Sequence, residues 1–396
     1  MTILSVIGTR PDAIKLLPVH LALQAAGIKS VLCSTAQHIE MLNQVLDIFK
    51  IKPDFDLQIM QENQDLFHIT SSALNKMKQV LDKVQPTLVL VQGDTTTAFA
   101  ATLAAVYKKI PVGHIEAGLR TGSLEAPYPE EMNRRFISMV GTYHFAPTSL
   151  NVANLLAEGV TRQSIILTGN TVVDSLHMII AKIKDGTLVI DPVIVSLVQK
   201  LKAEKKTIAL LTAHRRESFN GGLHNIFEAA QKTAQATPEL AFIYPHHPNP
   251  EVLRAIKDTG IADSQNIYLT QPLSYKELVY CLMECDWVAT DSGGIQEEAI
   301  SLGKPVVILR EKTERIEGVW EGIAHLAGTE TTSIIKFMSK THAQKKHFSQ
   351  TSIYGDGKAS KKIASFIQSL QAEKHHAIGD TQKPVRQQQP YTNTNL

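Results

Sequence analysis

The chain has 396 residues, 43% of them hydrophobic and 20% charged, and a formal net charge of +2. This length suggests two or three domains, the composition is typical of a soluble globular protein, and the balanced charge excludes the basic field that nucleic-acid binding needs. The three cysteines, Cys33, Cys281 and Cys285, form no pair of CxxC motifs, so they predict neither a disulfide framework nor a zinc site.

Strands and helices alternate through the first part of the chain. Residues 2–7 predict a short buried strand, and this run is too short for a signal peptide. No apolar run reaches the length of about 18 residues that a membrane span needs, so we expect a cytoplasmic protein with no membrane partner. Further strands are expected at 29–33, 87–91, 110–115, 143–145 and 165–167, and helices at 65–85 and 95–107. The alternation predicts a Rossmann-like domain over residues 1–170.

The same pattern restarts near residue 170. A loop at 184–192 and a helix at 193–205 lead to a second set of strands, expected at 207–211, 241–244, 267–269, 287–290 and 305–309, with a helix at 275–284. We therefore predict an α/β fold of two Rossmann-like domains with a cleft between them, the second over residues 171–357. A helix is expected at 358–371. The polar residues 373–396 have no apolar period and favour a disordered tail.

Three carboxylates lie just past strand ends or at a helix start in the first domain: Asp94, Glu116 and Glu130. The carboxyl ends of the strands line the ligand crevice of an open α/β sheet. Neighbouring acids push each other's pKa values apart, which suits proton transfer. Alternatively, Asp94 caps a helix and Glu130 complements a helix dipole. For any one residue the structural role is favoured; for the set we favour acid–base chemistry.

The turn after the first strand carries two cations, Arg10 and Lys15, and one glycine, Gly8. It lacks the G-x-G-x-x-G pattern, so it does not predict a tightly held dinucleotide. The cations are either ordinary surface charges or groups that meet a phosphate or steer an anionic substrate.

The second domain contains a turn suited to an anion, between a strand and a helix. Glycines let a ligand approach the backbone, and a helix N-terminus presents unpaired N–H groups. A diphosphate fits such a turn, although a plain tight turn is the alternative. Glu298, one helical turn further, can accept hydrogen bonds from ribose hydroxyls, while His214 and Arg315 can neutralise a leaving diphosphate. The turn is formed by Ser292, Gly293 and Gly294.

Taken together, these motifs resemble the non-hydrolysing UDP-N-acetylglucosamine 2-epimerases. The resemblance covers roughly residues 1–370 and rests on Gly-Thr-Arg-Pro-Asp-Ala-Ile-Lys at 8–15 and on the stretches 92–97, 114–122, 129–134, 212–217, 291–298 and 313–315. It implies the two-domain glycosyltransferase-B fold, with UDP held by the second domain and the final helix crossing back to the first. It also implies a homodimer, the family's usual form.

The resemblance further implies interconversion of UDP-GlcNAc and UDP-ManNAc, by elimination of UDP to an enzyme-bound 2-acetamidoglucal and re-addition. No nicotinamide, other cofactor or metal takes part in this chemistry. Asp94, Glu116 and Glu130 match the acid–base positions, with Arg134 beside them, and His214 matches the contact to the leaving diphosphate. The positions that match UDP-binding residues are Arg10, Lys15, Ser292, Gly293, Gly294, Glu298 and Arg315.

Some positions depart from the family pattern. Many bacterial members bind a second UDP-GlcNAc as an activator through two arginines, where this chain has Ile39 and Ser72. Leu278 stands where an aromatic residue often covers the uracil, so weaker base stacking is expected.

Four other functions stay open. They are the hydrolysing branch that releases UDP and free N-acetylmannosamine, an epimerase for another UDP-2-acetamido sugar, a glycosyltransferase on the same fold, and a non-catalytic nucleotide-sugar-binding module. The grouped carboxylates argue against the last, because a binding module gains nothing by placing like charges together.

Overall fold

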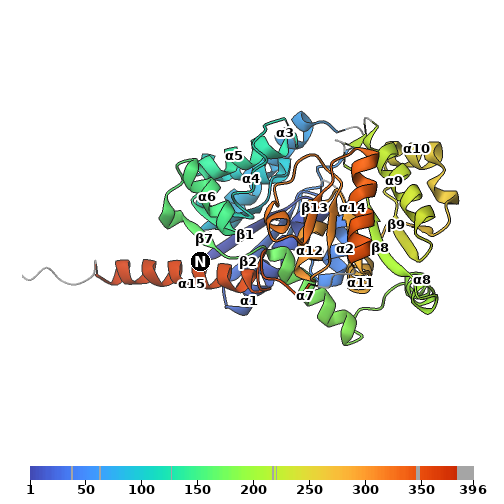
Figure 1. Cartoon of the computed structure of the whole chain (residues 1–396). Coiled ribbons are helices and arrows are strands. Elements are labelled where there is room, and N and C mark those ends of the chain that lie inside the picture. The colour runs from blue at the N-terminus through green and yellow to red at the C-terminus, as the bar shows by residue number, and fades with distance from the viewer. Residues whose placement is uncertain are drawn as a thin grey trace, which may run out of the picture.

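The computed structural model describes residues 1–36, 39–61, 64–125, 127–215, 218–219, 221–344 and 348–380. These residues form two lobes, each built on a sheet with helices packed on it (Figure 1). Each sheet is parallel, so helices cover both faces and its strands are nearly continuous apolar runs. This arrangement confirms the predicted fold class of two Rossmann-like domains.

The described strands of the first lobe are β1 (Thr2–Ile7), β2 (Lys29–Ser34), β3 (Phe55–Asp56), β4 (Leu88–Gln92), β5 (Val112–Ile115), β6 (Tyr143–Ala146) and β7 (Ile165–Leu167). Those of the second lobe are β8 (Thr207–Thr212), β9 (Leu240–Pro245), β10 (Ile267–Thr270), β11 (Trp287–Thr290), β12 (Val306–Ile308) and β13 (Ala324–Leu326). Among described residues they pair in the orders β3-β2-β1-β4-β5-β6-β7 and β10-β9-β8-β11-β12-β13.

The described α-helices in the first half of the chain are α1 (Arg10–Ala25), α2 (Ile39–Phe49), α3 (Leu66–Val84), α4 (Thr96–Tyr107), α5 (Glu130–Val140), α6 (Ser149–Ala157) and α7 (Thr171–Lys184). The later ones are α8 (Pro192–Ala203), α9 (Gly222–Ala236), α10 (Pro250–Thr259), α11 (Tyr275–Glu284), α12 (Gly293–Ser301), α13 (Glu317–Trp320), α14 (Thr331–Gln344) and α15 (Ala359–Asp380). Single 3-10 turns occupy Arg162–Ser164 and Ile261–Asp263. No described helix is long and apolar enough to span a bilayer.

Several expected boundaries need correction. The strands β3 and β13 were not predicted, because two or three residues give no readable period. The helix expected at 193–205 begins at Pro192, where Asp191 caps it and a proline suits the first position. The last helix does not end at 371 but continues to Asp380, since alanine, glutamate and lysine favour helix. The expected tail thus begins inside α15, and residues 381–396 lie outside the described part.

Helix α15 returns the end of the chain to the first lobe. Asp174 of α7 accepts the backbone N–H groups of Ala359 and Ser360 at 3.1 and 2.8 Å and so caps its start. Phe366 packs edge-on against Tyr143 of β6, with ring centroids 5.2 Å apart. In Figure 1 the far end of α15 projects away from both lobes. Helix α7 contacts α1 in the first lobe and α12 in the second, so the division at residue 170 stays a prediction.

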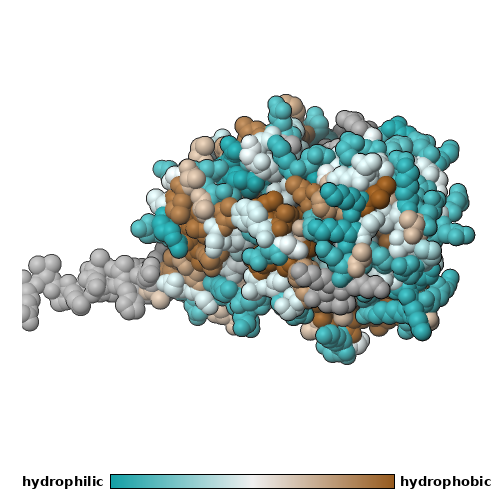
Figure 2. Space-filling view, in the orientation of Figure 1, coloured by the Kyte–Doolittle hydropathy of each residue, from teal (hydrophilic) through white to brown (hydrophobic). Residues whose placement is uncertain are grey.

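The surface gives little further guidance to function. On the face drawn in Figure 2, hydrophilic residues cover most of the second lobe, and apolar residues lie mainly toward the first lobe. Exposed apolar side chains of the first lobe include Phe67, Tyr107 and Met139. Scattered apolar side chains are normal on protein surfaces.

Candidate active site

Several of the predicted site residues lie where the strand order of each sheet reverses. In the first sheet this point falls between β1 and β4, and in the second between β8 and β11. Loops that leave the carboxyl ends of such strands diverge and open a crevice for a ligand. Arg10 and Asp94 follow β1 and β4, and His214 and Ser292 follow β8 and β11.

Glu116 is the most heavily paired of the three carboxylates. Its φ of +64° is left-handed, which is uncommon for a residue with a side chain and recurs at functional sites. Lys15 Nζ lies 2.6 Å from both carboxylate oxygens, Asn170 and Gln92 donate amide hydrogen bonds, and Arg315 Nη2 lies at 3.3 Å. Burial alone would raise the pKa of Glu116, but the charges of Lys15 and Arg315 outweigh it and lower that pKa.

Asp94 pairs with Arg134, as the family resemblance implied. Arg134 Nε lies 2.7 Å from Asp94 Oδ2, and the same guanidinium reaches Glu131 at 3.1 Å and Glu314 of the second lobe at 3.3 Å. The alternative that Asp94 caps the following helix is wrong, because the Thr95 side chain accepts the capping hydrogen bond of α4. The Asp94 side chain is 23% exposed and pairs with a buried guanidinium.

Glu130 differs from the other two carboxylates because it keeps an oxygen free. It begins α5, and its Oε2 is buried without a hydrogen-bond partner among the described residues. Burial first, and the nearby charge of Asp94 second, raise the pKa of Glu130, against the pull of Arg215 and Arg134. A buried carboxyl group with a raised pKa in a crevice is a candidate proton donor or acceptor.

The two cations of the first turn, Lys15 and Arg10, have different partners. Lys15 Nζ pairs with the carboxylate of Glu116, and its contact to a phosphate stays a prediction. Arg10 instead reaches across the crevice, where its Nη1 lies 3.5 Å from the backbone oxygen of Leu273 in the second lobe. Glu298 faces the same region and accepts the Tyr275 hydroxyl at 2.7 Å. Burial raises the pKa of Glu298 to about 7.

His214 stands at the end of β8, held by Asp291 from the neighbouring strand. Asp291 Oδ2 accepts the backbone N–H groups of His214 and Arg215, both at 2.7 Å, and Oδ1 lies 3.6 Å from His214 Nδ1. The ring of His214 stacks on His247 with centroids 5.1 Å apart. Burial lowers the pKa of His214, although Asp291 opposes this shift. Two loops from the switch point are thereby fixed to each other.

The two glycines of the predicted anion turn serve different ends. A Cβ on Gly293 would clash with Arg315 Nη1, so this glycine makes room for the guanidinium. A Cβ on Gly294 would meet nothing within 4 Å, so this face of the helix N-terminus is open to a ligand. The backbone N–H of Ser292 donates to Thr290 Oγ1 at 3.0 Å and shapes the turn. Arg315 itself is buried and pairs with the carboxylates of Glu116, Glu297 and Glu314.

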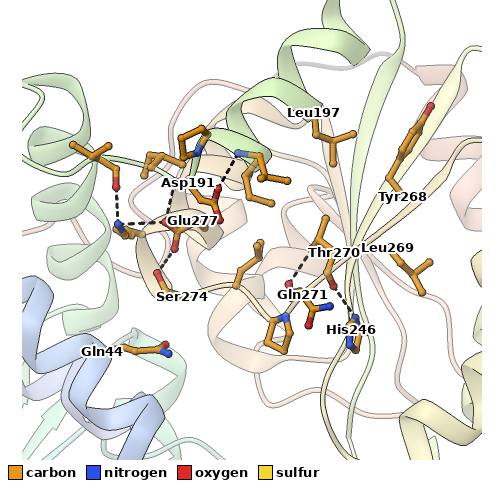
Figure 3. A pocket seen from close by; sticks show the side chains of 18 of the residues that line it. Gln44, Asp191, Leu197, His246, Tyr268, Leu269, Thr270, Gln271, Ser274 and Glu277 are labelled. Carbon is orange, nitrogen blue, oxygen red and sulfur yellow. Dashed lines mark hydrogen bonds and ion pairs between the residues drawn. The ribbon is translucent and has the colours of Figure 1, made fainter.

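A cavity of about 1180 Å³ adjoins this region. Its lining includes Gln44 of α2 on one side and residues 267–274 of the second lobe on the other (Figure 3). Leu273, whose backbone oxygen faces Arg10, is part of the lining, so the cavity lies next to the crevice. Apolar side chains such as Ile194 and Leu197 form a further wall.

The raised pKa of Glu298 predicts a pH-dependent penalty on stability. Between its ordinary value of 4.5 and its folded value of about 7, the native state binds more protons than the unfolded state. The free energy of unfolding therefore falls as pH rises through this range. Glu298→Gln can still accept from Tyr275 but cannot titrate. It should gain about 1–3 kcal/mol of unfolding free energy over the wild type at pH 8, and less at pH 5.

Urea unfolding at both pH values measures this difference. Glu330→Gln is the matched control, because Glu330 is exposed and the same substitution there should change neither curve. Parallel pH dependence of wild type and Glu298→Gln would contradict the prediction.

Comparison with known proteins identifies the family. The family model described as UDP-N-acetylglucosamine 2-epimerase matches residues 21–368. A UDP-N-acetylglucosamine 2-epimerase of Neisseria meningitidis serogroup A is 45% identical over 372 residues, which are 93% of this chain and 99% of that relative. The chain belongs to the UDP-N-acetylglucosamine 2-epimerase family.

Solved structures extend the likeness to three dimensions. The crystal structure of UDP-GlcNAc 2-epimerase from Neisseria meningitidis bound to UDP-GlcNAc has a TM-score of 0.86 and 43% identity, covering 93% of this chain and 100% of that chain. The Methanocaldococcus jannaschii enzyme in complex with UDP-GlcNAc and UDP has a TM-score of 0.80 and 29% identity, with the same coverage. The expected two-domain glycosyltransferase-B arrangement is thereby confirmed.

Several residues that complete the site were not predicted from the sequence. Asn170 follows the short strand β7, and the strand-end rule that selected Asp94 would have found it there. Glu297 and Glu314 stand beside residues that were selected, but each also has a partner in the other lobe, which the sequence does not reveal. Among the described residues, no cluster of three or more histidine, cysteine, aspartate or glutamate side chains could hold a metal ion.

Proposed function

We propose that this protein interconverts UDP-GlcNAc and UDP-ManNAc as a non-hydrolysing 2-epimerase. The observation that carries this proposal is a contact between the lobes: Arg315 Nη2, beside the glycine turn of the second lobe, lies 3.3 Å from Glu116 Oε1 of the first. The relatives solved with UDP-GlcNAc or UDP support the choice of substrate.

The proposed reaction has two halves. A base removes the proton from C2 of the sugar while the C1–O bond to UDP breaks, which leaves 2-acetamidoglucal and UDP in the crevice. The UDP oxygen then adds back to C1 while an acid delivers a proton to C2 from the opposite face. Together the two halves need a proton-transfer group on each face of the sugar and stabilisation of the departing diphosphate.

The carboxylates suit different parts of this scheme. Glu130, with a free buried oxygen and a raised pKa, suits a group that gives up and takes back a proton. Glu116, held ionised by Lys15 and Arg315, suits a base or a negative charge beside a developing positive one. Asp94 lies close enough to Glu130 to raise the pKa of that carboxyl group, so the two groups act as a pair.

The second lobe supplies the proposed UDP site. The open face at Gly294 receives a phosphate on the helix N-terminus, with His214 and Arg215 at the neighbouring strand end. The nucleoside of UDP is placed beside Arg10 and Glu298, and the adjoining cavity has room for it. We further propose a cytoplasmic homodimer whose product supplies ManNAc-type sugars for surface polysaccharide.

Incubation of enzyme with UDP-GlcNAc alone in D2O tests the function. We expect deuterium at C2 and accumulation of UDP-ManNAc with little free UDP, read by proton NMR. Free UDP with a reducing sugar would instead identify the hydrolysing reaction. No change in UDP-GlcNAc would favour a transferase, a binding module or another UDP-2-acetamido sugar, and the assay is then repeated with those sugars.

The kinetics should lack activation by substrate. Ile39 and Ser72 cannot form the bidentate contacts that arginines make to a diphosphate. We expect a hyperbolic dependence of rate on UDP-GlcNAc, and a reverse reaction from pure UDP-ManNAc that needs no added UDP-GlcNAc. A sigmoidal curve with a strict requirement for UDP-GlcNAc in the reverse direction would refute this.

A further inference from the structure

Glu297 is a buried acid beside the anion turn whose neighbours differ from those of Glu298. Its residue is 1% exposed. Consecutive positions on an α-helix point about 100° apart, so the two glutamates of α12 face different surroundings. Glu298 accepts from Tyr275 inside the second lobe, whereas Glu297 accepts Arg315 Nε at 2.5 Å and the side-chain amide of Asn170.

Both partners of Glu297 also contact Glu116. The Asn170 amide nitrogen lies 2.8 Å from Glu116 Oε1, and Arg315 Nη2 lies 3.3 Å from the same oxygen. One amide and one guanidinium therefore bridge a carboxylate of the second lobe and a carboxylate of the first. Because each donor group contacts both carboxylates, the position of Glu297 affects how that donor is oriented toward Glu116.

The surroundings show that this arrangement is costly. Burial raises the pKa of Glu297 and the charge of Glu116 adds to the rise, while Arg315 and Lys15 oppose it. Glu298 on the same helix and the hydroxyl of Tyr354 also face this region. Two carboxylates are kept out of water together, and such burial is weak evidence for a purely stabilising role.

We infer that Glu297 is a positioning residue for the reaction, which holds the guanidinium of Arg315 and the amide of Asn170 in place over Glu116. This inference rests on the proposed epimerase function and deepens it. It gives Glu116 part of its hydrogen-bonding environment from the opposite lobe. Misplaced donors change the charge and orientation of Glu116 during turnover, while the open face at Gly294, the proposed phosphate position, keeps its space.

The test is Glu297→Gln in the full-length enzyme. Glutamine can accept from Asn170 or from Arg315 but cannot hold both donors as the carboxylate does. We expect kcat to fall at least about tenfold while KM for UDP-GlcNAc and the affinity for UDP stay within about threefold. The pH midpoint of kcat should shift by at least about 0.5 unit, because one titrating neighbour of Glu116 is gone.

Glu317→Gln is the matched control. Glu317 also accepts across the lobes, from Thr148 Oγ1 at 2.5 Å, but it shares neither Asn170 nor Arg315. This variant should keep kcat within about twofold and leave the pH profile unchanged. If Glu297→Gln does not fold, Glu297→Asp should show the same split between kcat and KM, because the shortened side chain cannot span both donors.

Three results would overturn the inference. A Glu297→Gln enzyme with normal kcat and an unchanged pH profile would make Glu297 a structural ion pair, even with a lowered melting temperature. A raised KM with normal kcat would make it a binding residue. An equal change in Glu317→Gln would point to general contact between the lobes. If the wild type shows no exchange at C2, the proposed function fails instead.

Discussion

Glu130→Gln should lower turnover at least about 10²-fold and leave the fold intact, because positioned acid–base groups typically contribute roughly 10²–10⁴-fold. Its Oε2 has no hydrogen-bond partner among the described residues, so the amide breaks no contact there. UDP affinity should stay within a few-fold, since the proposed cradle is in the other lobe. Deuterium exchange at C2 and a thermal melt measure the two effects on one sample.

Asp94→Asn and Glu116→Gln should lose at least as much activity, but with a cost in stability. Each removes the charge that faces a buried cation, Arg134 or Lys15. Breaking one side of a buried pair typically costs about 3–5 kcal/mol. A variant with a lowered melting temperature and normal turnover would show that the substituted residue is structural and not catalytic. If all three variants keep their rates, the proposed mechanism is wrong.

Gly294→Val should remove most UDP binding, with a loss of affinity of at least about tenfold, or 1.4 kcal/mol. A branched side chain at the helix N-terminus blocks the close approach of a phosphate. The fold has space for this side chain, because a Cβ at Gly294 meets nothing within 4 Å. Calorimetry with UDP should therefore show weak binding by a protein with a normal melting temperature.

Gly293→Ala separates the two glycines. Here the added methyl group meets the guanidinium of Arg315, so we expect disturbed turnover as well as altered binding.

Affinity for UDP unchanged within about twofold in Gly294→Val, on the order of 0.4 kcal/mol, would count against the turn as the phosphate site.

The strand-end positions of the site could be predicted from sequence, and the contacts between lobes could not. Asp94 and Glu116 follow buried apolar strands, and such strands are readable without knowledge of the tertiary fold. Which of the two glutamates, Glu297 or Glu298, contacts the first lobe depends on the rotation of α12 relative to that lobe. The sequence gives the angle between their side chains, but the docking of the lobes decides what each one meets.

A similar limit, on contacts between distant segments, explains why the ion pairs of Lys15 and Arg315 were not predicted. Both were expected to meet a phosphate, and a cation beside a glycine turn supports that expectation. In the structure each lies on Glu116, and Arg315 arrives from residues far away in the chain. The pair of Arg315 with Glu116 follows from how the two lobes approach each other, and the pair of Lys15 with Glu116 follows from the packing of distant segments within the first lobe. A single sequence carries no periodic signal for either contact.

The return of α15 to the first lobe sets an order of events during synthesis. The strands of the first sheet leave the ribosome early, but the helix that packs on α1 and β6 is made only after the whole second lobe. Domains generally fold as units while the chain is made, and long-range contacts form late. The surface of the first lobe that α15 covers therefore stays exposed until α15 itself has been synthesised.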